Sequence, residues 1–487
     1  MRFSKINVKI HVLVIALFIL LAMPMIANAL PAFPGAEGWG ADTIGGRSAS
    51  TKLYKVNTLS DGTSGSCSGN VCTGTLRYAL TASGPRIVIF TVAGTIALQS
   101  DIWVNNGYVT VAGQTAPGTG VQVRNASVRF ENANHVIVRG MKFRPGDSPG
   151  GPIDDRDGVA DLGGSYVIFD HNSAGFSCDG VMSAWYPLSH VTFSYNLMAY
   201  ALENTCSEYD ARLMLLGGII DQAGPYIQQF SLHHNLFAHS KVRTPGLAPG
   251  TRAEIINNVV YNTKVQSWAS WTASESAWIG NYWKNGPMRT GSNSGLWITC
   301  ETFPWCTIKQ SVYLAHSICP NRPTDSGDET LCIIGGSEYY TSTNPITLSS
   351  MTIDSPTVAY SKVLGPAGQG AGAYPRDSLD SKVISDVING TGPSDLCASE
   401  ECYGGYPTLS GTYPTDSDGD GIPDAWENSK GLNPSNSADA LQYAPSGYLW
   451  IEEYINSFFP ANGSAVVSPI PTPSALIPNP PSIIRIN

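Results

Sequence analysis

The feature that most constrains the fold is a short pattern that recurs along the chain and always ends in asparagine. Its copies are segments 167–172, 191–196, 230–235, 253–258 and 276–281. Successive asparagines are 24, 39, 23 and 23 residues apart, and the longest interval equals one period plus an insertion around 203–218. Before each asparagine, apolar and polar residues alternate, as in a strand with one buried face. Similar strands at 108–112 and 135–139 extend the pattern upstream.

A period in the low twenties fits one coil of a solenoid whose equivalent strands pair from coil to coil. We therefore predict an all-β parallel β-helix in which the asparagines stack on one another. An asparagine at a bend tolerates left-handed backbone geometry, and its amide can bond the neighbouring coil. The alternative is that each asparagine marks an independent turn. Gly 50 and Pro 33 exclude a helical bundle.

The first 29 residues resemble a secretory signal. Arg2, Lys5 and Lys9 precede an apolar run that ends at Pro24, and Ala27-Asn28-Ala29 supplies small residues for cleavage. The alternative, a membrane anchor, needs a longer apolar run. We expect a secreted protein, extracellular or, in a Gram-negative host, periplasmic, that is not held in a membrane after signal removal.

Cysteine and charge counts agree with export and limit the partners. Ten cysteines follow the signal, and their spacing favours the local pairs Cys67/Cys72, Cys300/Cys306, Cys319/Cys332 and Cys397/Cys402, with Cys178/Cys206 as a longer one. Zinc is the rival use of cysteine, but no CxxC pair occurs. Lys+Arg 28 against Asp+Glu 38, without a basic block, gives no footprint for nucleic acid.

Beyond the signal at 1–29, the sequence divides into four stretches. The repeat places the β-helix at 30–286, and 287–410 is expected to hold peripheral coils and disulfide-rich loops. A calcium-loop segment follows at 411–463. Residues 464–487 are rich in proline and poor in charge, as in a linker or tail.

An acidic loop near the C-terminus predicts a calcium site of EF-hand type. Its expected ligands are Asp416, Asp418, Asp420, the main-chain carbonyl of Ile422, Asp424 and Glu427, with glycine at loop position 6. Without the ion these carboxylates would repel one another, so metal binding and local folding should be coupled. The alternative is an acidic solvated turn. We interpret the loop as a stabilising or docking element.

A second acidic cluster is the expected centre of the chemistry. On an extended segment Asp155 and Asp157 point to the same side, and Asp179 from another part of the coil can complete a cage of oxygens that suits Ca²⁺. Downstream, Lys241 and Arg243 share one face if extended and would grip a polymer that carries carboxylates. The alternatives are ordinary turn-forming aspartates and a solvated basic turn.

Several motifs resemble the secreted pectate lyases of polysaccharide lyase family 1. They are Phe33-Pro-Gly-Ala-Glu-Gly-Trp-Gly-Ala, Ala112-Gly-Gln-Thr-Ala-Pro-Gly, the Asp170-His171 strand, and His233-His-Asn-Leu-Phe-Ala-His followed by Arg243-Thr-Pro. The resemblance spans roughly residues 32 to 285. It implies a right-handed β-helix and calcium-dependent β-elimination of polygalacturonate, the acidic polysaccharide of plant cell walls. We also expect a monomer.

By motif position, the resemblance implies roles for particular residues. Asp155, Asp157 and Asp179 match calcium ligands, and Arg243 matches the catalytic base. Arginine is normally protonated, so the site must disfavour its cation. Two departures weaken the expected grip on substrate: Gly246 stands where relatives commonly have a second arginine, and Ser183 where they have a fourth acid. Lys241, Arg212 or Arg252 are candidates to compensate.

Two other functions remain open from the sequence. A hydrolase resembling a polygalacturonase would use Asp154, Asp155 and Asp179 as acid and base with water. A non-catalytic polysaccharide-binding β-helix would keep the solenoid and the loop at Asp416 but would not need Arg243.

Overall fold

The computed structural model describes residues 30–147, 156–203, 205, 211–217, 227–264, 267–269, 274–289, 294–298, 310–336 and 344–459. All of them except Leu30 belong to the compact unit Pro31–Asn487. Within these residues, no helix is both long and apolar enough to cross a membrane. The signal, Asp154, Asp155 and the proline-rich tail lie outside the described residues.

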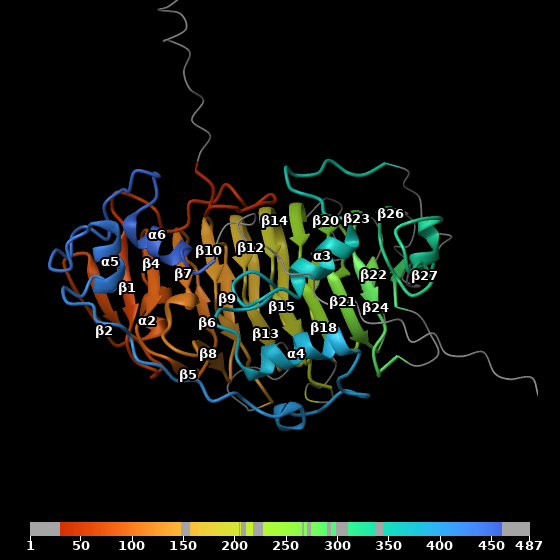
Figure 1. Ribbon diagram of the computed structural model, residues 1–487, viewed down its shortest axis with the longest axis horizontal. Coiled ribbons are helices and arrows are strands. Elements are labelled where there is room, and N and C mark those ends of the chain that lie inside the picture. Colours follow the sequence, from red (N-terminus) through yellow and green to blue (C-terminus); the bar gives the residue numbers. More distant parts are fainter. Residues whose placement is uncertain are drawn as a thin grey trace, which may run out of the picture. The chain divides into compact units, whose positions relative to one another are not determined.

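The described strands form a parallel β-helix, as the repeat predicts (Figure 1). Their pairings divide them into three ladders. Ladder 1 contains β1 (Lys52–Val56), β4 (Arg86–Phe90), β7 (Val109–Ala112), β10 (Val136–Arg139), the second halves of β12 (Val159–Asp170) and β14 (Met182–Ser194), β17 (Ile227–His233), β20 (Thr251–Ile256), β23 (Glu275–Ile279) and β26 (Ser311–Ala315). At its start, β3 (Val71–Gly74) pairs with β1, and β2 (Gly65–Ser68) runs antiparallel to β3.

The other two ladders complete each coil. Ladder 2 contains β6 (Ile102–Val104), β9 (Val128–Glu131), the first halves of β12 and β14, β16 (Leu215–Gly217), β19 (Gly246–Leu247), β22 (Ser267–Ala269), β25 (Leu296–Ile298) and β27 (Ile333–Gly335). Ladder 3 contains β5 (Gly94–Ala97), β8 (Val121–Arg124), β11 (Lys142–Phe143), β13 (Ser173–Gly175), β15 (Leu197–Ala199), β18 (Leu236–Ser240), β21 (Val259–Thr263) and β24 (Tyr282–Lys284). The coils therefore continue past residue 286 through β25, β26 and β27.

The repeated asparagines stack along the turn between ladders 1 and 3. The side-chain amide of each donates to the next, from Asn172 to Asn196 and Asn235 at 3.0 Å per step, and the chain goes on to Asn258 and Asn281. These side chains are buried, so the stack satisfies amide groups that would otherwise be costly to bury.

The sequence predicts the left-handed backbone conformation of this turn at the asparagine. The structure gives that conformation to the residue before the asparagine instead. His171, Tyr195 and His234 have φ of 50°, 50° and 54°. Their rings stack at centroid distances of 4.8 Å, which offsets part of the backbone strain. The asparagine itself can then point its amide along the stack.

Strand alternation predicts one buried face, but ladders 1 and 3 are covered on both. Outside ladder 1, Ile87 and Ile89 pack against Ile422 and the helix α6 (Trp450–Asn456). Outside ladder 3, α3 (Pro356–Val363) and α4 (Ser378–Asn389) supply the apolar cover. Among the described residues, the outer face of ladder 2 contributes to none of these outer clusters.

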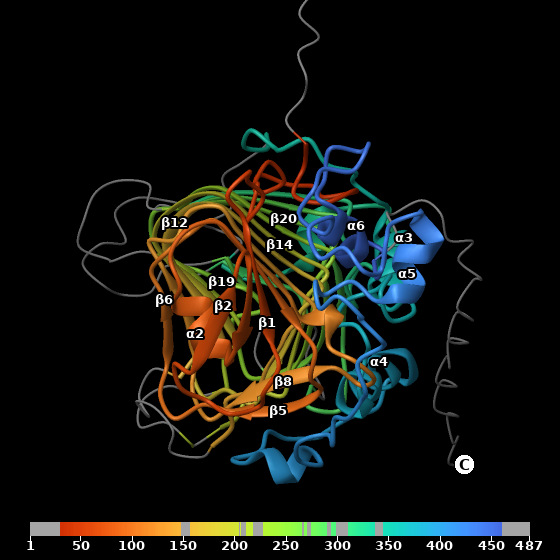
Figure 2. The same cartoon turned by 90° about the vertical axis from the view of Figure 1, so that its left-hand side faces the viewer.

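Short helices and disulfides close the ends and loops. Helix α2 (Leu76–Thr81) lies over one end of the coil, where it buries Leu76 and Leu80 in the core (Figure 2). The remaining short helices are α5 (Asp424–Lys430), η1 (Gly113–Thr115), η3 (Glu329–Cys332) and η5 (Glu400–Tyr403).

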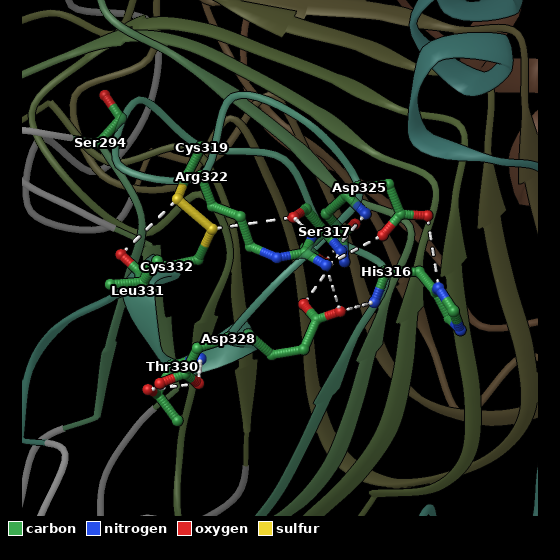
Figure 3. The surroundings of a disulfide bond; sticks show 12 residues. Ser294, His316, Ser317, Cys319, Arg322, Asp325, Asp328, Thr330, Leu331 and Cys332 are labelled. Carbon is green, nitrogen blue, oxygen red and sulfur yellow. Dashed lines mark hydrogen bonds and ion pairs between the residues drawn. A yellow bond between two sulfur atoms is a disulfide. The ribbon is translucent and has the colours of Figure 1, made fainter.

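Three predicted disulfides are confirmed, and the other two pairs involve undescribed cysteines. The confirmed pairs are Cys67–Cys72, Cys319–Cys332 and Cys397–Cys402. Cys178 is also disulfide-bonded. Beside Cys319–Cys332, Arg322 forms an ion pair with Asp325 at 3.1 Å (Figure 3).

Both described ends of the chain pack on one internal strand. The guanidinium of Arg139, on β10, lies 3.6 Å from the ring centroid of Phe33 and 4.4 Å from that of Phe459. Arg139 also donates to Asp170 at 2.9 Å.

Candidate active site

Two residues of the predicted acidic cluster, Asp157 and Asp179, lie in the turns that lead into ladder 2. Asp157 precedes β12 and is almost fully buried, and its Oδ1 accepts a hydrogen bond of 3.0 Å from the hydroxyl of Ser183 on β14. A Cβ added to Gly180 would lie 2.2 Å from the same oxygen, so glycine lets the turn after Asp179 approach Asp157. The two aspartates thus belong to touching turns of neighbouring coils, as predicted.

Asp179 also meets two arginines from later coils. Its Oδ1 lies 3.3 Å from Nη1 of Arg212 and 3.9 Å from Nη1 of Arg243. Arg212 and Val242 pair as an isolated parallel bridge, which sets the two arginine turns side by side. Arg243 has a φ of 60°, an uncommon value for a residue with a side chain. The structure therefore brings Asp157, Asp179, Arg212 and Arg243 together.

Gly246 makes room for the side chain of Arg243. A Cβ at Gly246 would come within 2.9 Å of Cγ of Arg243, so that side chain lies across the glycine on β19. A second arginine at this position would displace the first. Glycine in place of the second arginine that relatives commonly have at position 246 therefore goes together with the placement of Arg243.

Other predicted cations lie elsewhere. Lys241 forms an ion pair of 3.2 Å with Glu203, whereas Arg243 pairs with Asp179. The left-handed backbone at Arg243 breaks the extended geometry on which their shared face depended. Arg252 pairs with Glu275 on exposed parts of ladder 1 and does not replace a second arginine at the site.

The Asp170-His171 strand of the family motif forms a separate network on ladder 1. Asp170 accepts hydrogen bonds from Ser194 at 2.7 Å and from Arg139, and contacts Nδ1 of His171 at 2.8 Å. Burial raises the pKa of Asp170, but its charged partners outweigh burial and hold this pKa well below the ordinary value. Burial and the neighbouring His234 lower the pKa of His233 to about 3. This network orders the turn and is on a different ladder from Arg243.

The C-terminal acidic loop has the chemistry of a cation site. Oxygens of Asp416, Asp418 and Asp420 lie within 4.8 Å of one another, and so do those of Asp420, Glu427 and Asp439. Glu427 is fully buried, and within the described residues neither of its oxygens has a hydrogen-bond donor. Burial and neighbouring carboxylates raise the pKa of Asp420 to about 8 and that of Glu427 to about 7. Such orphaned acids fit an oxygen-ligated cation.

The observed acids differ from the predicted loop set at two positions. Asp424 accepts hydrogen bonds from the backbone and the hydroxyl of Ser417, at 2.7 and 2.6 Å, and lies outside both clusters of described acids. Asp439, beyond the loop motif, was missed because the motif covers only contiguous residues. In the sequence Asp439 is one aspartate in a polar segment, and only the structure shows that it is buried.

Comparisons with known proteins give a consistent result. No protein-family model matches the sequence. The chain is 33% identical over 470 residues to the probable pectate lyase C of Aspergillus terreus, a match that covers 92% of this chain and 99% of that one. The probable pectate lyase C of Neosartorya fischeri is 34% identical over 465 residues, covering 91% and 97%.

Solved structures agree at the level of fold. A structure reported for the substrate specificity and anti β-elimination mechanism of pectate lyase has a TM-score of 0.50 and 16% identity, and covers 72% of this chain and 99% of that one. This likeness supports the parallel β-helix alone.

Proposed function

Because the chain belongs to the pectate lyase family, as its full-length relatives show, we propose that it cleaves polygalacturonate, the de-esterified form of pectin, by calcium-dependent β-elimination. The observation that carries the proposal is the meeting of Asp157, Asp179, Arg212 and Arg243 in the turns that lead into ladder 2, whose outer face joins none of the outer apolar clusters of the described residues. An acid cluster beside guanidinium groups suits a substrate that carries carboxylates.

We assign the metal site to Asp157 and Asp179, with Asp155 as the third ligand expected from the family resemblance. Carboxylate oxygens without nitrogen or sulfur donors suit Ca²⁺ rather than zinc. When bound, the ion neutralises the uronate carboxylate and stabilises the negative charge that develops next to it. Ser183 supplies a hydroxyl at the position where relatives have a further acid, and orients Asp157.

Arg243 is the proposed base, and Arg212 the proposed substrate-binding cation. Neutral Arg243 removes the proton from C5 of the uronate, the C5 electrons form the C4–C5 double bond, and the bond from C4 to the glycosidic oxygen breaks. The departing oxygen keeps the electron pair of that bond and takes a proton from water, which leaves a hydroxyl group on the released part of the chain. Arg212 shares Asp179 with Arg243, so the two guanidinium groups are held beside the same carboxylate. Lys241 lies two residues before Arg243, pairs with Glu203, and is the second proposed substrate-binding cation.

The experiment measures the ultraviolet absorbance of unsaturated products from polygalacturonate, with and without chelator. We expect absorbance that chelator abolishes, and a 10²- to 10⁴-fold fall in kcat for Arg243→Ala. Arg252→Ala is the matched control because Arg252 pairs with Glu275 on ladder 1. Saturated reducing ends would support the hydrolase alternative, which the lyase relatives do not favour, and binding without cleavage would support a non-catalytic module.

We further propose that the C-terminal loop binds a structural Ca²⁺ through Asp416, Asp418, Asp420, Ile422, Glu427 and Asp439. The side chain of Ile422 packs with Leu53 and Ile89 of ladder 1, so the loop is continuous with the apolar cover of that ladder. Lys55 on β1 pairs with Asp416 at 3.6 Å. A stabilising role therefore fits better than a docking role.

We also propose that the protein is exported and acts as a monomer on the plant cell wall. The disulfides support an oxidising compartment. Polygalacturonate is its proposed macromolecular partner.

A further inference from the structure

Two exposed tryptophans occupy matching positions on the outer face of ladder 2. Trp103 is the middle residue of β6 and 45% exposed, and Trp297 is the middle residue of β25 and 37% exposed. In both strands the flanking residues are fully buried in the core. Each indole therefore points outward from an anchored strand, where a ligand on this face can contact it.

Strand register places both tryptophans in one row with the candidate active site. Trp103 pairs with Arg129, Arg129 with Ala160, and Ala160 with Ser183, the partner of Asp157. On the other side, Gly246, which lies beneath Arg243, pairs with Trp268, and Trp268 pairs with Trp297. The row between the tryptophans thus passes both the proposed calcium aspartates and the proposed base.

Arg129 links Trp103 directly to the acidic cluster. Its guanidinium lies 5.5 Å from the indole centroid, and its Nη1 lies 3.9 Å from Oδ2 of Asp157. Arg129 is itself fixed by a hydrogen bond of 2.9 Å to Asp101. One side of the indole is therefore held, and the ring is presented as a rigid platform.

We propose that Trp103 and Trp297 are stacking platforms for sugar rings of the polygalacturonate chain, one on each side of the cleavage point. This inference rests on the proposed function. An aromatic platform suits this substrate because the C–H face of a pyranose ring is apolar. The carboxylates of the polymer gain little electrostatic attraction from the protein, which has 38 acidic and 28 basic residues. Stacking thus holds the outer parts of the polymer without demanding further cations.

The row gives the two platforms different reaches. Trp103 lies five strands from Gly246 and Trp297 lies two strands from it. At about 4.8 Å per strand, these separations are about 24 Å and about 10 Å. Only a long chain bound across Arg243 can reach Trp103, so this platform should matter for polymer and not for short oligosaccharides.

The test compares KM and kcat of Trp103→Ala and Trp297→Ala on long polygalacturonate, and Trp103→Ala also on trigalacturonate. We expect KM for the polymer to rise about five- to tenfold in each variant with kcat little changed, which corresponds to the loss of one aromatic contact. Trp103→Ala should leave kcat/KM on trigalacturonate unchanged, and Trp103→Phe should retain most of the wild-type affinity for polymer.

The control is Tyr108→Ala, which removes a similarly exposed ring, 43%, from the turn that precedes β7 of ladder 1. An unchanged polymer KM in both tryptophan variants would overturn the proposal, as would an equal change in Tyr108→Ala or on trigalacturonate. Should Trp103→Ala lower the melting temperature, Trp103→Gln replaces it. Affinity electrophoresis in gels that contain polygalacturonate reads binding without turnover, so it separates loss of a platform from failure of the lyase function.

Discussion

Replacing Asp161 by valine should stabilise the protein, and by more as the pH rises. Asp161 pairs in register with Phe130 and Ala184, which both belong to the central apolar core, and is itself fully buried. Within the described residues neither of its carboxyl oxygens has a hydrogen-bond partner. Burial raises the pKa of Asp161 well above its ordinary value, so the folded protein holds this acid protonated.

The size of the effect has two parts. A buried neutral acid without hydrogen bonds costs about 1–3 kcal/mol, which valine removes at any pH. Above the pKa of the unfolded chain, about 3.9, the unfolded state releases a proton that the folded state keeps. Unfolding then becomes easier by about 1.4 kcal/mol per pH unit, until the pH reaches the raised pKa of the folded state. The advantage of the valine variant should therefore grow as the pH rises from about 4.5.

Urea unfolding at about pH 4.5, 5.5 and 6.5 measures this difference in the free energy of unfolding. Asp161→Asn is the matched control because it removes the titration but keeps a polar group. Asp161→Asn should therefore abolish the pH-dependent part of the difference in the free energy of unfolding and leave the constant part. The reasoning is refuted if the difference between wild type and Asp161→Val does not change with pH, or if the valine variant is the less stable protein.

Three further outcomes follow from the described contacts. Asp439→Asn should reduce the rise in melting temperature that calcium produces, measured by thermal unfolding with and without chelator, whereas Asp424→Asn should retain most of it; an equal loss would contradict the revised ligand set. Asn235→Ala should lower the free energy of unfolding by roughly 2–4 kcal/mol in urea, because it strips partners from both neighbours in the stack; a loss below about 1 kcal/mol would argue against the stack as a stabilising element. Gly246→Ala should reduce kcat about tenfold or more at nearly unchanged melting temperature, because the new Cβ displaces Arg243; an unaltered kcat would show that this placement is not needed.

The repeat could be predicted from the sequence because one coil fits within each period. Strand alternation and the recurring Asn172, Asn196 and Asn235 are local signals, and the structure stacks these residues as expected. The cover of ladders 1 and 3 could not be predicted in this way, because Ile422 and helix α4 come from far along the chain. The left-handed position was misplaced by one residue, since histidine and tyrosine give no local signal for it.

The candidate site was predictable in composition but not in its pairings. Asp157, Asp179, Arg212 and Arg243 were all identified, and the structure brings them together. Lys241 was expected beside Arg243 on an extended segment, but the left-handed backbone at Arg243 and the ion pair with Glu203 separate their roles. Side-chain partners from other coils depend on how many residues each turn inserts, which a period cannot specify.

The clamp of Phe33 and Phe459 on Arg139 has a consequence for how the molecule comes apart. An open solenoid usually unravels from its outermost coils, where each strand has one neighbour only. Here Phe33 and Phe459 both pack on Arg139 of β10, which has a paired strand on each side, so fraying of an outer coil leaves both contacts in place. Loss of such a coil would therefore remain local, and the segments around Phe33 and Phe459 would still bridge the strands next to β10.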